Sequence, residues 1–264
     1  MSSIVWFSGN GNSRLVARRL SELTGFRSLP LIESGKPLES ISAGTVVWVF
    51  PVYSWGVPPI VEKLLASIDI HPDTLHYLVL TCGDDCGFTH LQWRAMIEKK
   101  GLTTATAWSV IMPNTYVLLP GMNVDSDTLA DKKLAEAAAL LPSIAATILR
   151  GETVDDNVKQ GSMPRLKSDI IYPFFTKRMM SPKPFHATGN CIHCTRCVKR
   201  CPLANITMSS QATPVWGDNC ALCLGCYHVC PVHAVAYGRR TGSKGQYHAP
   251  LMLPTVPSEK QNCM

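Results

Sequence analysis

The chain has 264 residues, of which 46% are hydrophobic and 17% charged, and its formal net charge is +6. This composition is typical of a folded protein and excludes an intrinsically disordered one. No apolar run approaches the ~20 residues of a membrane-spanning helix, and no signal peptide precedes the first apolar residues. We therefore expect a cytoplasmic protein with no membrane span.

Strand-like and helical patterns alternate over the first 150 residues. The strand-like runs are rich in Val, Ile and Leu without alternation, which is typical of parallel strands buried on both faces. They cover residues 4–7, 45–51, 77–82 and 105–112, with a weaker run near 27–31, and the helical patterns between them cover 13–23, 59–68, 89–99 and 126–150. This order predicts an α/β domain, a doubly wound parallel five-stranded sheet.

The last of these helices has two candidate N-caps, Asp125 and Ser126, because both side chains can accept a hydrogen bond from the first helical turn. Pro142 lies inside the same pattern and is expected to kink or divide the helix.

A Gly- and hydroxyl-rich turn follows the first predicted strand and leads into the first helix. It consists of Ser8, Gly9, Asn10, Gly11, Asn12 and Ser13. Backbone N–H groups in such a turn, together with the helix dipole, form a cradle for a phosphate group. The turn has neither the G-x-G-x-x-G pattern of dinucleotide-binding domains nor the Lys-Ser/Thr ending of a P-loop.

Two further loops are expected at the same edge of the sheet, where flavin mononucleotide (FMN) binds in doubly wound folds. After the run 45–51 come Pro51, Val52, Tyr53, Ser54, Trp55 and Gly56, and after the run 77–82 come Thr81, Cys82, Gly83 and Asp84. Tyr53 and Trp55 are candidates to stack on a flat ring, and packing of the first helix against the sheet is the alternative. Cys82 and Cys86 are either a redox pair or two small buried residues.

Beyond residue 150 the pattern changes. Residues 151–184 read as a connector with one apolar patch at 170–175, which either docks on a neighbouring domain or forms a short buried helix that serves the cysteine-containing part alone. Residues 185–240 hold a cysteine repeat, and residues 241–264 read as a tail without periodicity. The sequence thus predicts an N-terminal domain at 1–150 and a small cysteine-containing α+β domain at 185–240.

Eight of the eleven cysteines repeat one spacing, C-x2-C-x2-C-x3-C-P. The copies are Cys191, Cys194, Cys197 and Cys201, and Cys220, Cys223, Cys226 and Cys230. Bacterial ferredoxins bind [4Fe–4S] clusters with this run, and the fourth cysteine of each run ligates the other cluster. The predicted ligand sets are therefore Cys191, Cys194, Cys197 and Cys230 for one cluster, and Cys220, Cys223, Cys226 and Cys201 for the other.

A zinc ribbon is the alternative to iron–sulfur clusters, because paired CxxC motifs also bind zinc. Zinc would leave the third cysteine of each triplet and the prolines unexplained. The positive charge also bears on the interpretation, since residues 151–264 carry 13 Lys/Arg against 6 Asp/Glu. Anionic clusters account for this excess; no basic stripe interleaved with aromatics supports a nucleic-acid partner.

The loop FSGNGNS resembles the phosphate loop T/S-x-T-G-N-T of flavodoxins, with Asn10 and Ser13 at positions where that family has threonine. Together with the cysteine repeat, residues 1–245 resemble bacterial flavodoxin–ferredoxin fusion proteins. This resemblance implies an oxidoreductase that transfers electrons between FMN and two [4Fe–4S] clusters, and a redox partner protein or a small electron donor or acceptor.

Two other functions fit the same residues. A reductase would bind a small substrate over the flavin near Tyr53, Trp55 and Asp84. A regulatory module would have lost FMN and kept the clusters for structure. An electron carrier should instead have its flavin edge shielded or facing the cluster domain.

Overall fold

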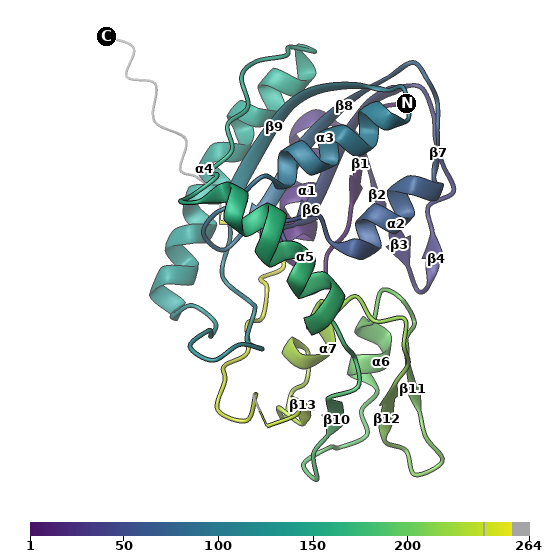
Figure 1. Cartoon of the computed structure of the whole chain (residues 1–264), viewed down its shortest axis with the longest axis vertical. Coiled ribbons are helices and arrows are strands. Elements are labelled where there is room, and N and C mark those ends of the chain that lie inside the picture. Colours follow the sequence, from purple (N-terminus) through teal and green to yellow (C-terminus); the bar gives the residue numbers. More distant parts are fainter. Residues whose placement is uncertain (240, 255–264) are drawn as a thin grey trace.

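The computed structural model describes residues 1–239 and 241–254 of the chain. Figure 1 shows an N-terminal α/β part above a smaller C-terminal part, with a green helical segment running across the front between them.

The N-terminal part is built around five parallel strands. They are β1 (Ser3–Trp6), β2 (Arg27–Pro30), β6 (Gly44–Pro51), β8 (Thr74–Cys82) and β9 (Thr103–Ile111), in the order β2-β1-β6-β8-β9. Counted along the chain, this is the order 2-1-3-4-5 of flavodoxin-like folds. The predicted doubly wound sheet is confirmed. Two small two-stranded sheets lie outside this sheet. One pairs β3 (Ile32–Glu33) with β4 (Lys36–Pro37), and the other pairs β5 (Ser40–Ile41) with β7 (Asp69–Ile70).

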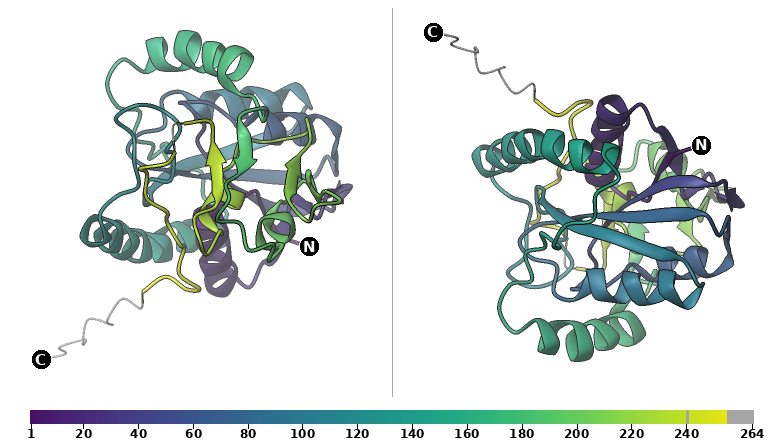
Figure 2. Two further views of the ribbon diagram at one scale, coloured as in Figure 1. Left: turned by 90° about the horizontal axis from the view of Figure 1, so that it is seen from below. Right: turned by 90° about the horizontal axis from the view of Figure 1, so that it is seen from above.

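Helices cover both faces of the sheet (Figure 2). α1 (Asn12–Thr24) and α4 (Asp127–Leu149) pack on one face, and α2 (Pro59–Ser67) and α3 (Thr89–Lys99) on the other. This explains why the strands read as apolar without alternation, since both of their faces are buried. Ser126 is the N-cap of α4 and accepts from the Leu129 N–H, and α4 continues unbroken through Pro142.

His76 in β8 is a fully buried histidine, and its hydrogen bonds within the sheet favour the neutral ring. Its Nδ1 accepts from the indole N–H of Trp48 at 2.9 Å, so the ring proton sits on Nε2, 2.8 Å from Thr74 Oγ1. Burial lowers the pKa of His76 from 6.5 to about 4. Between these two values the unfolded chain binds more protons than the folded one, so stability falls as the pH falls.

We expect lowering the pH from 7 to 5 to cost about 2 kcal/mol through His76 alone. Urea unfolding of the anaerobic protein at both pH values measures this, and His76→Gln should flatten the dependence by that amount. His90, whose pKa burial also lowers, accounts for part of the slope that remains. An unchanged slope in His76→Gln would contradict the assignment.

The connector contains a helical segment that is longer than the short helix considered for the apolar patch 170–175. It runs through η1 (Leu166–Ile171), α5 (Tyr172–Phe174) and η2 (Phe175–Met179), with π-helical backbone at both ends. Of the predicted apolar patch, Phe175 is buried, whereas Ile170 and Phe174 are exposed. Three further apolar side chains are also exposed: Met163, just before the segment, and Leu166 and Ile171 within it.

The C-terminal part contains two short two-stranded antiparallel sheets and two short helices. β10 (Phe185–Ala187) pairs with β13 (Val235–Tyr237), and β11 (Ile206–Met208) with β12 (Pro214–Trp216). α6 (Arg196–Arg200) and α7 (Gly225–His228) lie beside them. One core cluster joins this part to Val117 and Leu118 of the N-terminal part and to Phe175 of the connector. The two parts are therefore packed together.

The described part of the predicted tail, residues 241–254, has no regular secondary structure and contacts both parts. Gln246 donates to the carbonyls of Tyr227 and Cys230, and Gly245 N–H donates to Asn123 Oδ1. Arg18 of α1 donates to the Leu251 carbonyl. Residues 255–264 of that prediction lie outside the described residues. Within the part of the chain that the structure describes, no helix is both long and apolar enough to cross a membrane.

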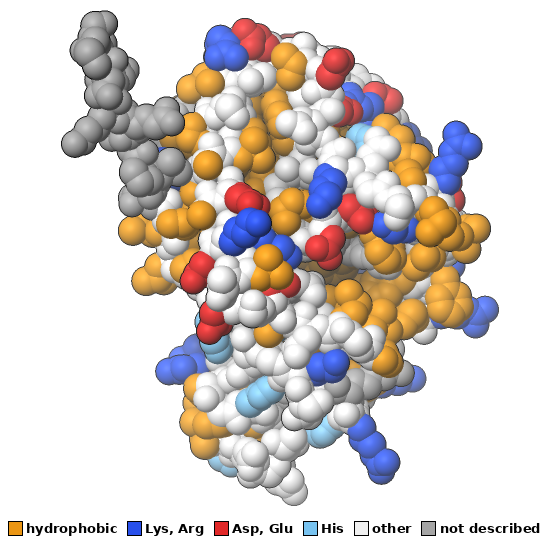
Figure 3. Space-filling model, turned by 90° about the vertical axis from the view of Figure 1, so that its left-hand side faces the viewer, with side chains coloured by type: hydrophobic (Ala, Val, Ile, Leu, Met, Phe, Trp, Pro, Cys, Tyr) orange, Lys and Arg blue, Asp and Glu red, His pale blue; other side chains and the backbone are white. Residues whose placement is uncertain are grey.

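On the face drawn in Figure 3, acidic side chains lie over the upper, N-terminal part, where Lys and Arg side chains are interspersed with them, while the lower part shows Lys, Arg and His side chains. This distribution follows the excess of basic residues in the second half of the chain.

Candidate functional site

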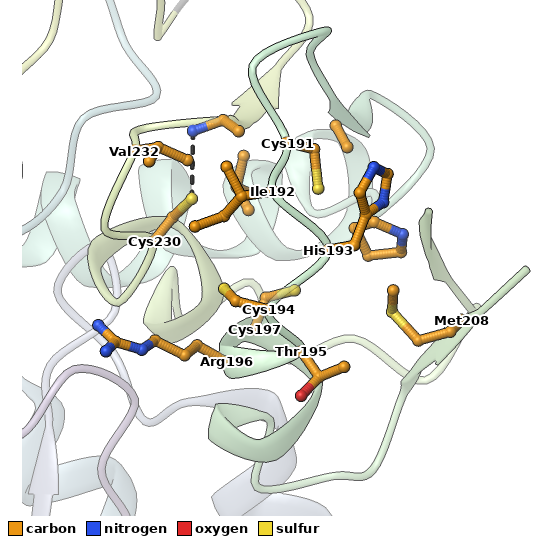
Figure 4. A pocket seen from close by; sticks show the side chains of 14 residues that line it. Cys191, Ile192, His193, Cys194, Thr195, Arg196, Cys197, Met208, Cys230 and Val232 are labelled. Atoms are coloured by element: carbon orange, nitrogen blue, oxygen red, sulfur yellow. Dashed lines mark hydrogen bonds between the residues drawn. The ribbon is translucent and has the colours of Figure 1, made fainter. Parts of the chain in front are cut away.

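Each predicted set of four cysteines surrounds one small pocket. Cys191, Cys194, Cys197 and Cys230 line the first (Figure 4). Cys201, Cys220, Cys223 and Cys226 line the second. The structure thus places the fourth cysteine of each run with the triplet of the other run. Among the described residues, no three His, Cys, Asp or Glu side chains gather around a point where one metal ion would sit.

The two cysteine loops repeat an unusual backbone. Positive φ angles occur at non-glycine residues in matching positions of the two runs, and a left-handed backbone is uncommon for such residues. The pairs are His193 (57°) with Leu222 (51°), Thr195 (60°) with Leu224 (60°), and Ala204 (50°) with His233 (53°). Repetition at equivalent positions indicates that the loops are shaped for the same ligand.

N–H groups point at several of the cysteine sulfurs. The two fourth cysteines accept in matching fashion, Cys201 from Asn205 N–H at 3.3 Å and Cys230 from Ala234 N–H at 3.1 Å. Trp216 Nε1 donates to Cys226 Sγ at 3.4 Å. Hydrogen bonds to sulfur stabilise thiolates, and in iron–sulfur proteins they adjust the reduction potential.

The second set of cysteines is more deeply buried than the first. Burial raises the pKa of Cys223 to about 12, and it also raises those of Cys220 and Cys226. Buried thiols of this kind ionise when a metal binds them, because the cation supplies the charge that solvent does not. In the first set, Cys194 is exposed. The residues present fit two cubane clusters, one close to the surface and one inside.

A cavity of about 430 Å³ lies between the N-terminal part, the connector and the second cysteine set. Its size suits one small cofactor, because ligand pockets usually measure about 300–1,000 Å³. It lies at the carboxyl ends of β1, β6, β8 and β9, where doubly wound folds bind ligands. Most of the predicted cofactor-binding residues line it: Ser8, Gly9, Asn10, Asn12, Ser13, Pro51, Val52, Tyr53, Ser54, Trp55, Thr81, Cys82, Gly83 and Asp84.

Gly11 and Gly56 do not line the cavity. A Cβ on Gly11 would lie 2.6 Å from the Cβ of Ala249, and one on Gly56 would overlap the ring of Tyr172. Both glycines therefore permit close packing of other segments against the cavity loops.

The turn at residues 8–13 is held rigidly at the floor of the cavity. Ser8 Oγ accepts from Gly11 N–H at 3.1 Å, and Ser13 Oγ lies 2.7 Å from Thr81 Oγ1. Asn12 Nδ2 donates to the Pro113 carbonyl, whereas Asn12 Oδ1 is buried and has no partner among the described residues. An unpaired buried acceptor indicates that a bound molecule with a hydroxyl or N–H donor completes this site.

The aromatic wall is a tight hairpin. Tyr53 and Gly56 exchange both backbone hydrogen bonds at 3.0 Å, and Ser54 and Trp55 both have positive φ. Burial, followed by the nearby Cys223 and Cys220, raises the pKa of Tyr53 well above its usual value. Tyr53 therefore lies between the cavity and the second cysteine set.

The connector is bound to the aromatic wall and to the loop after β8. Ser168 Oγ donates to the Trp55 carbonyl and accepts from Phe88 N–H, both at 2.8 Å. Lys167 Nζ lies 2.7 Å from Asp85 Oδ2 and 5.0 Å from the centre of the Trp55 ring. Tyr172 OH donates to the Val57 carbonyl at 2.6 Å. These contacts cover the aromatic wall from outside.

Cys82 and Cys86 lie in contact, with Cys86 Sγ donating to Cys82 Sγ at 3.2 Å. Cys86 is fully buried in the core. The hydrogen bond from Cys86, burial and the adjacent acidic residues Asp85 and Asp84 raise the pKa of Cys82 well above its usual value. This environment favours the thiol, whereas reactive cysteines need a stabilised thiolate.

Several cavity residues were not among the predicted cofactor-binding residues. They come from the loop after β9, the connector and the second cysteine loop, and include Met112, Pro113, Asn114, Thr115, Tyr116, Ile171, Phe175, Met179, Leu222, Cys223 and Leu224. The sequence carried a signal only for the run 112–116, which ends the last predicted strand.

Residues 176–235 match the family described as "4Fe-4S dicluster domain". The chain carries a 4Fe–4S dicluster domain. This domain follows a flavodoxin-like α/β domain, which the strand order establishes. Comparison with curated proteins finds no match.

Two solved structures are similar to the flavodoxin-like part. One is a putative flavoprotein from Bacteroides uniformis ATCC 8492, with 12% identity, 42% of this chain and 89% of that chain covered, and a TM-score of 0.36. The other is the Trp repressor binding protein from Bacillus subtilis, with 11% identity, 53% and 97% coverage, and a TM-score of 0.31.

Proposed function

We propose that the chain is an electron-transfer oxidoreductase that binds FMN in the 430 Å³ cavity and two [4Fe–4S] clusters in the dicluster domain. One observation carries the proposal: Cys223, a predicted cluster ligand, lines the same cavity as the phosphate loop and the aromatic wall. FMN accepts two electrons and each cubane exchanges one, so such a protein connects two-electron and one-electron partners.

The residues assign a role to each side of the site. We propose that the turn 8–13 holds the phosphate, that Tyr53 and Trp55 flank the ring, and that the loop 81–84 faces its polar edge. Cys191, Cys194, Cys197 and Cys230 would hold one cluster, and Cys201, Cys220, Cys223 and Cys226 the other. We also propose the division into domains at residues 1–150 and 185–240, joined by the connector 151–184.

The positions of the two cysteine sets relative to the cavity support electron transfer rather than reduction of a bound substrate. Cys194 is exposed at one end of the dicluster domain, while Cys223 reaches the cavity at the other. A substrate would need access above the aromatic wall, yet Ser168 and Lys167 bind the carbonyl of Trp55 and the carboxylate of Asp85 there. The cavity faces the cluster domain, as an electron carrier requires.

We expect anaerobically purified protein to contain one FMN and about eight iron and eight acid-labile sulfide atoms per chain. Flavin released by denaturation and separated by chromatography identifies the flavin, and colorimetric assays measure iron and sulfide. Protein with full iron and sulfide that takes up no added FMN would support a regulatory module instead. Stoichiometric zinc without sulfide would exclude the clusters.

A further inference from the structure

Arg200 extends from the cluster loop to the phosphate loop. It is the last residue of α6 and directly precedes Cys201. A Cβ placed on Gly225, in the second cysteine loop, would lie 3.5 Å from Arg200 Cγ. A Cβ placed on Gly11, in the phosphate loop, would lie 3.7 Å from Arg200 Nη2. The guanidinium therefore lies at the junction of the two loops, on the outer side of the turn 8–13, since neither Arg200 nor Gly11 lines the cavity or the second cysteine pocket.

The charge of this guanidinium is not balanced by protein groups. Arg200 is half-buried, and the positively charged Arg14 lies near enough to act on it. Neither Arg200 nor Arg14 has an ion pair or a side-chain hydrogen bond within residues 1–239 and 241–254. A partly buried cation without a counter-ion is unfavourable. Its position makes sense when anions are bound on both sides.

Building on the function proposed above, we propose that Arg200 is the shared counter-charge of two bound anions, the phosphate monoester on the turn 8–13 and the cluster held by Cys201, Cys220, Cys223 and Cys226. Because it belongs to the dicluster domain, the flavodoxin-like domain binds phosphate fully only when the two domains are docked. Arg200 then favours FMN over riboflavin, which has the same ring but no phosphate.

The test compares the binding of FMN and riboflavin to flavin-depleted protein that keeps its clusters. Kd values are measured from flavin fluorescence for the wild type, Arg200→Gln and Arg200→Lys. Lys199→Gln is the matched control, because it removes an exposed positive charge from the same helix. We expect Arg200→Gln to weaken FMN binding about tenfold, the effect of losing one charged partner. Riboflavin binding should stay within about twofold, Arg200→Lys should restore most of the FMN affinity, and Lys199→Gln should change little.

A second measurement does not depend on flavin binding. Removing a positive charge beside a cluster makes reduction less favourable. Arg200→Gln should therefore lower the reduction potential of one cluster, followed by spectroelectrochemistry, at unchanged iron content. Arg200→Lys should keep the wild-type potential.

Three outcomes would overturn the inference. Equal weakening of FMN and riboflavin would show that Arg200 only packs the loops, and loss of iron in Arg200→Gln and Arg200→Lys alike would show the same. Unchanged FMN affinity and potential would show that neither anion is near the guanidinium. Failure of the wild-type protein to bind FMN at all would instead remove the proposed function, and the inference with it.

Discussion

Cys201→Ser should remove the cluster bound by the second triplet, although Cys201 belongs to the first run in sequence. Iron should fall from about eight to about four atoms per chain. The reason is geometric: Cys201 lines the pocket of Cys220, Cys223 and Cys226, and its Sγ accepts from Asn205 N–H there. Alkylation of the native protein followed by peptide mass spectrometry measures which thiols have lost their cluster.

Cys230→Ser is the matched variant, because Cys230 occupies the equivalent position in the other run and accepts from Ala234 N–H. In Cys201→Ser, the second triplet should become alkylated while Cys191, Cys194 and Cys197 stay protected. The pattern should reverse in Cys230→Ser. If each variant instead exposes the triplet of its own run, the ligation is sequential and the crossed assignment is wrong.

The sequence predicts those parts of the fold and of the site that depend on the spacing of residues along the chain. Four of the five strands stand out because burial on both faces selects continuous Val, Ile and Leu runs, whereas the edge strand β2 has no buried residue and gives only a weak pattern. Fourteen of the sixteen predicted cofactor-binding residues line the cavity because they follow strand ends, and parallel strands bring their ends together at one edge of the sheet. The pairing of the cysteines into two pockets likewise follows from spacing alone.

Spacing along the chain does not predict contacts between segments that are distant in the sequence. Gly9 looked like a residue that lets a phosphate approach the backbone, yet its Cβ position faces the Cβ of Cys223 at 2.5 Å. Arg200 reads as a basic residue beside a cluster, and only the docking of the domains brings it to Gly11. The length of the helical segment 166–179 could not be predicted from its apolar residues. Ile170 and Phe174 are exposed and Phe175 is buried, so these residues do not mark one buried face of a helix.

Gly225→Ala should separate the redox sites. A Cβ on Gly225 would lie 2.6 Å from the carbonyl oxygen of Gly9, a backbone atom that cannot rotate away. Overpacking of this kind costs about 1–3 kcal/mol, which raises the ratio of undocked to docked forms about fivefold to about 150-fold. Gly189→Ala is the control, because Gly189 has no positive φ and no atom within 4 Å of its Cβ position.

Rapid reduction of the clusters by a one-electron donor, with flavin absorbance followed in time, measures the consequence. In the wild type and in Gly189→Ala, flavin should be reduced at a rate independent of protein concentration, since Cys223 lies at the cavity wall. In Gly225→Ala, measured at saturating FMN, this phase should lose amplitude to a slower phase that depends on protein concentration, at unchanged iron content. Electron transfer falls steeply with distance, so the contact between Gly9 and the second cysteine loop sets the rate. A wild-type rate proportional to protein concentration would mean that electrons pass between molecules, and the packing of the two domains would then serve stability alone.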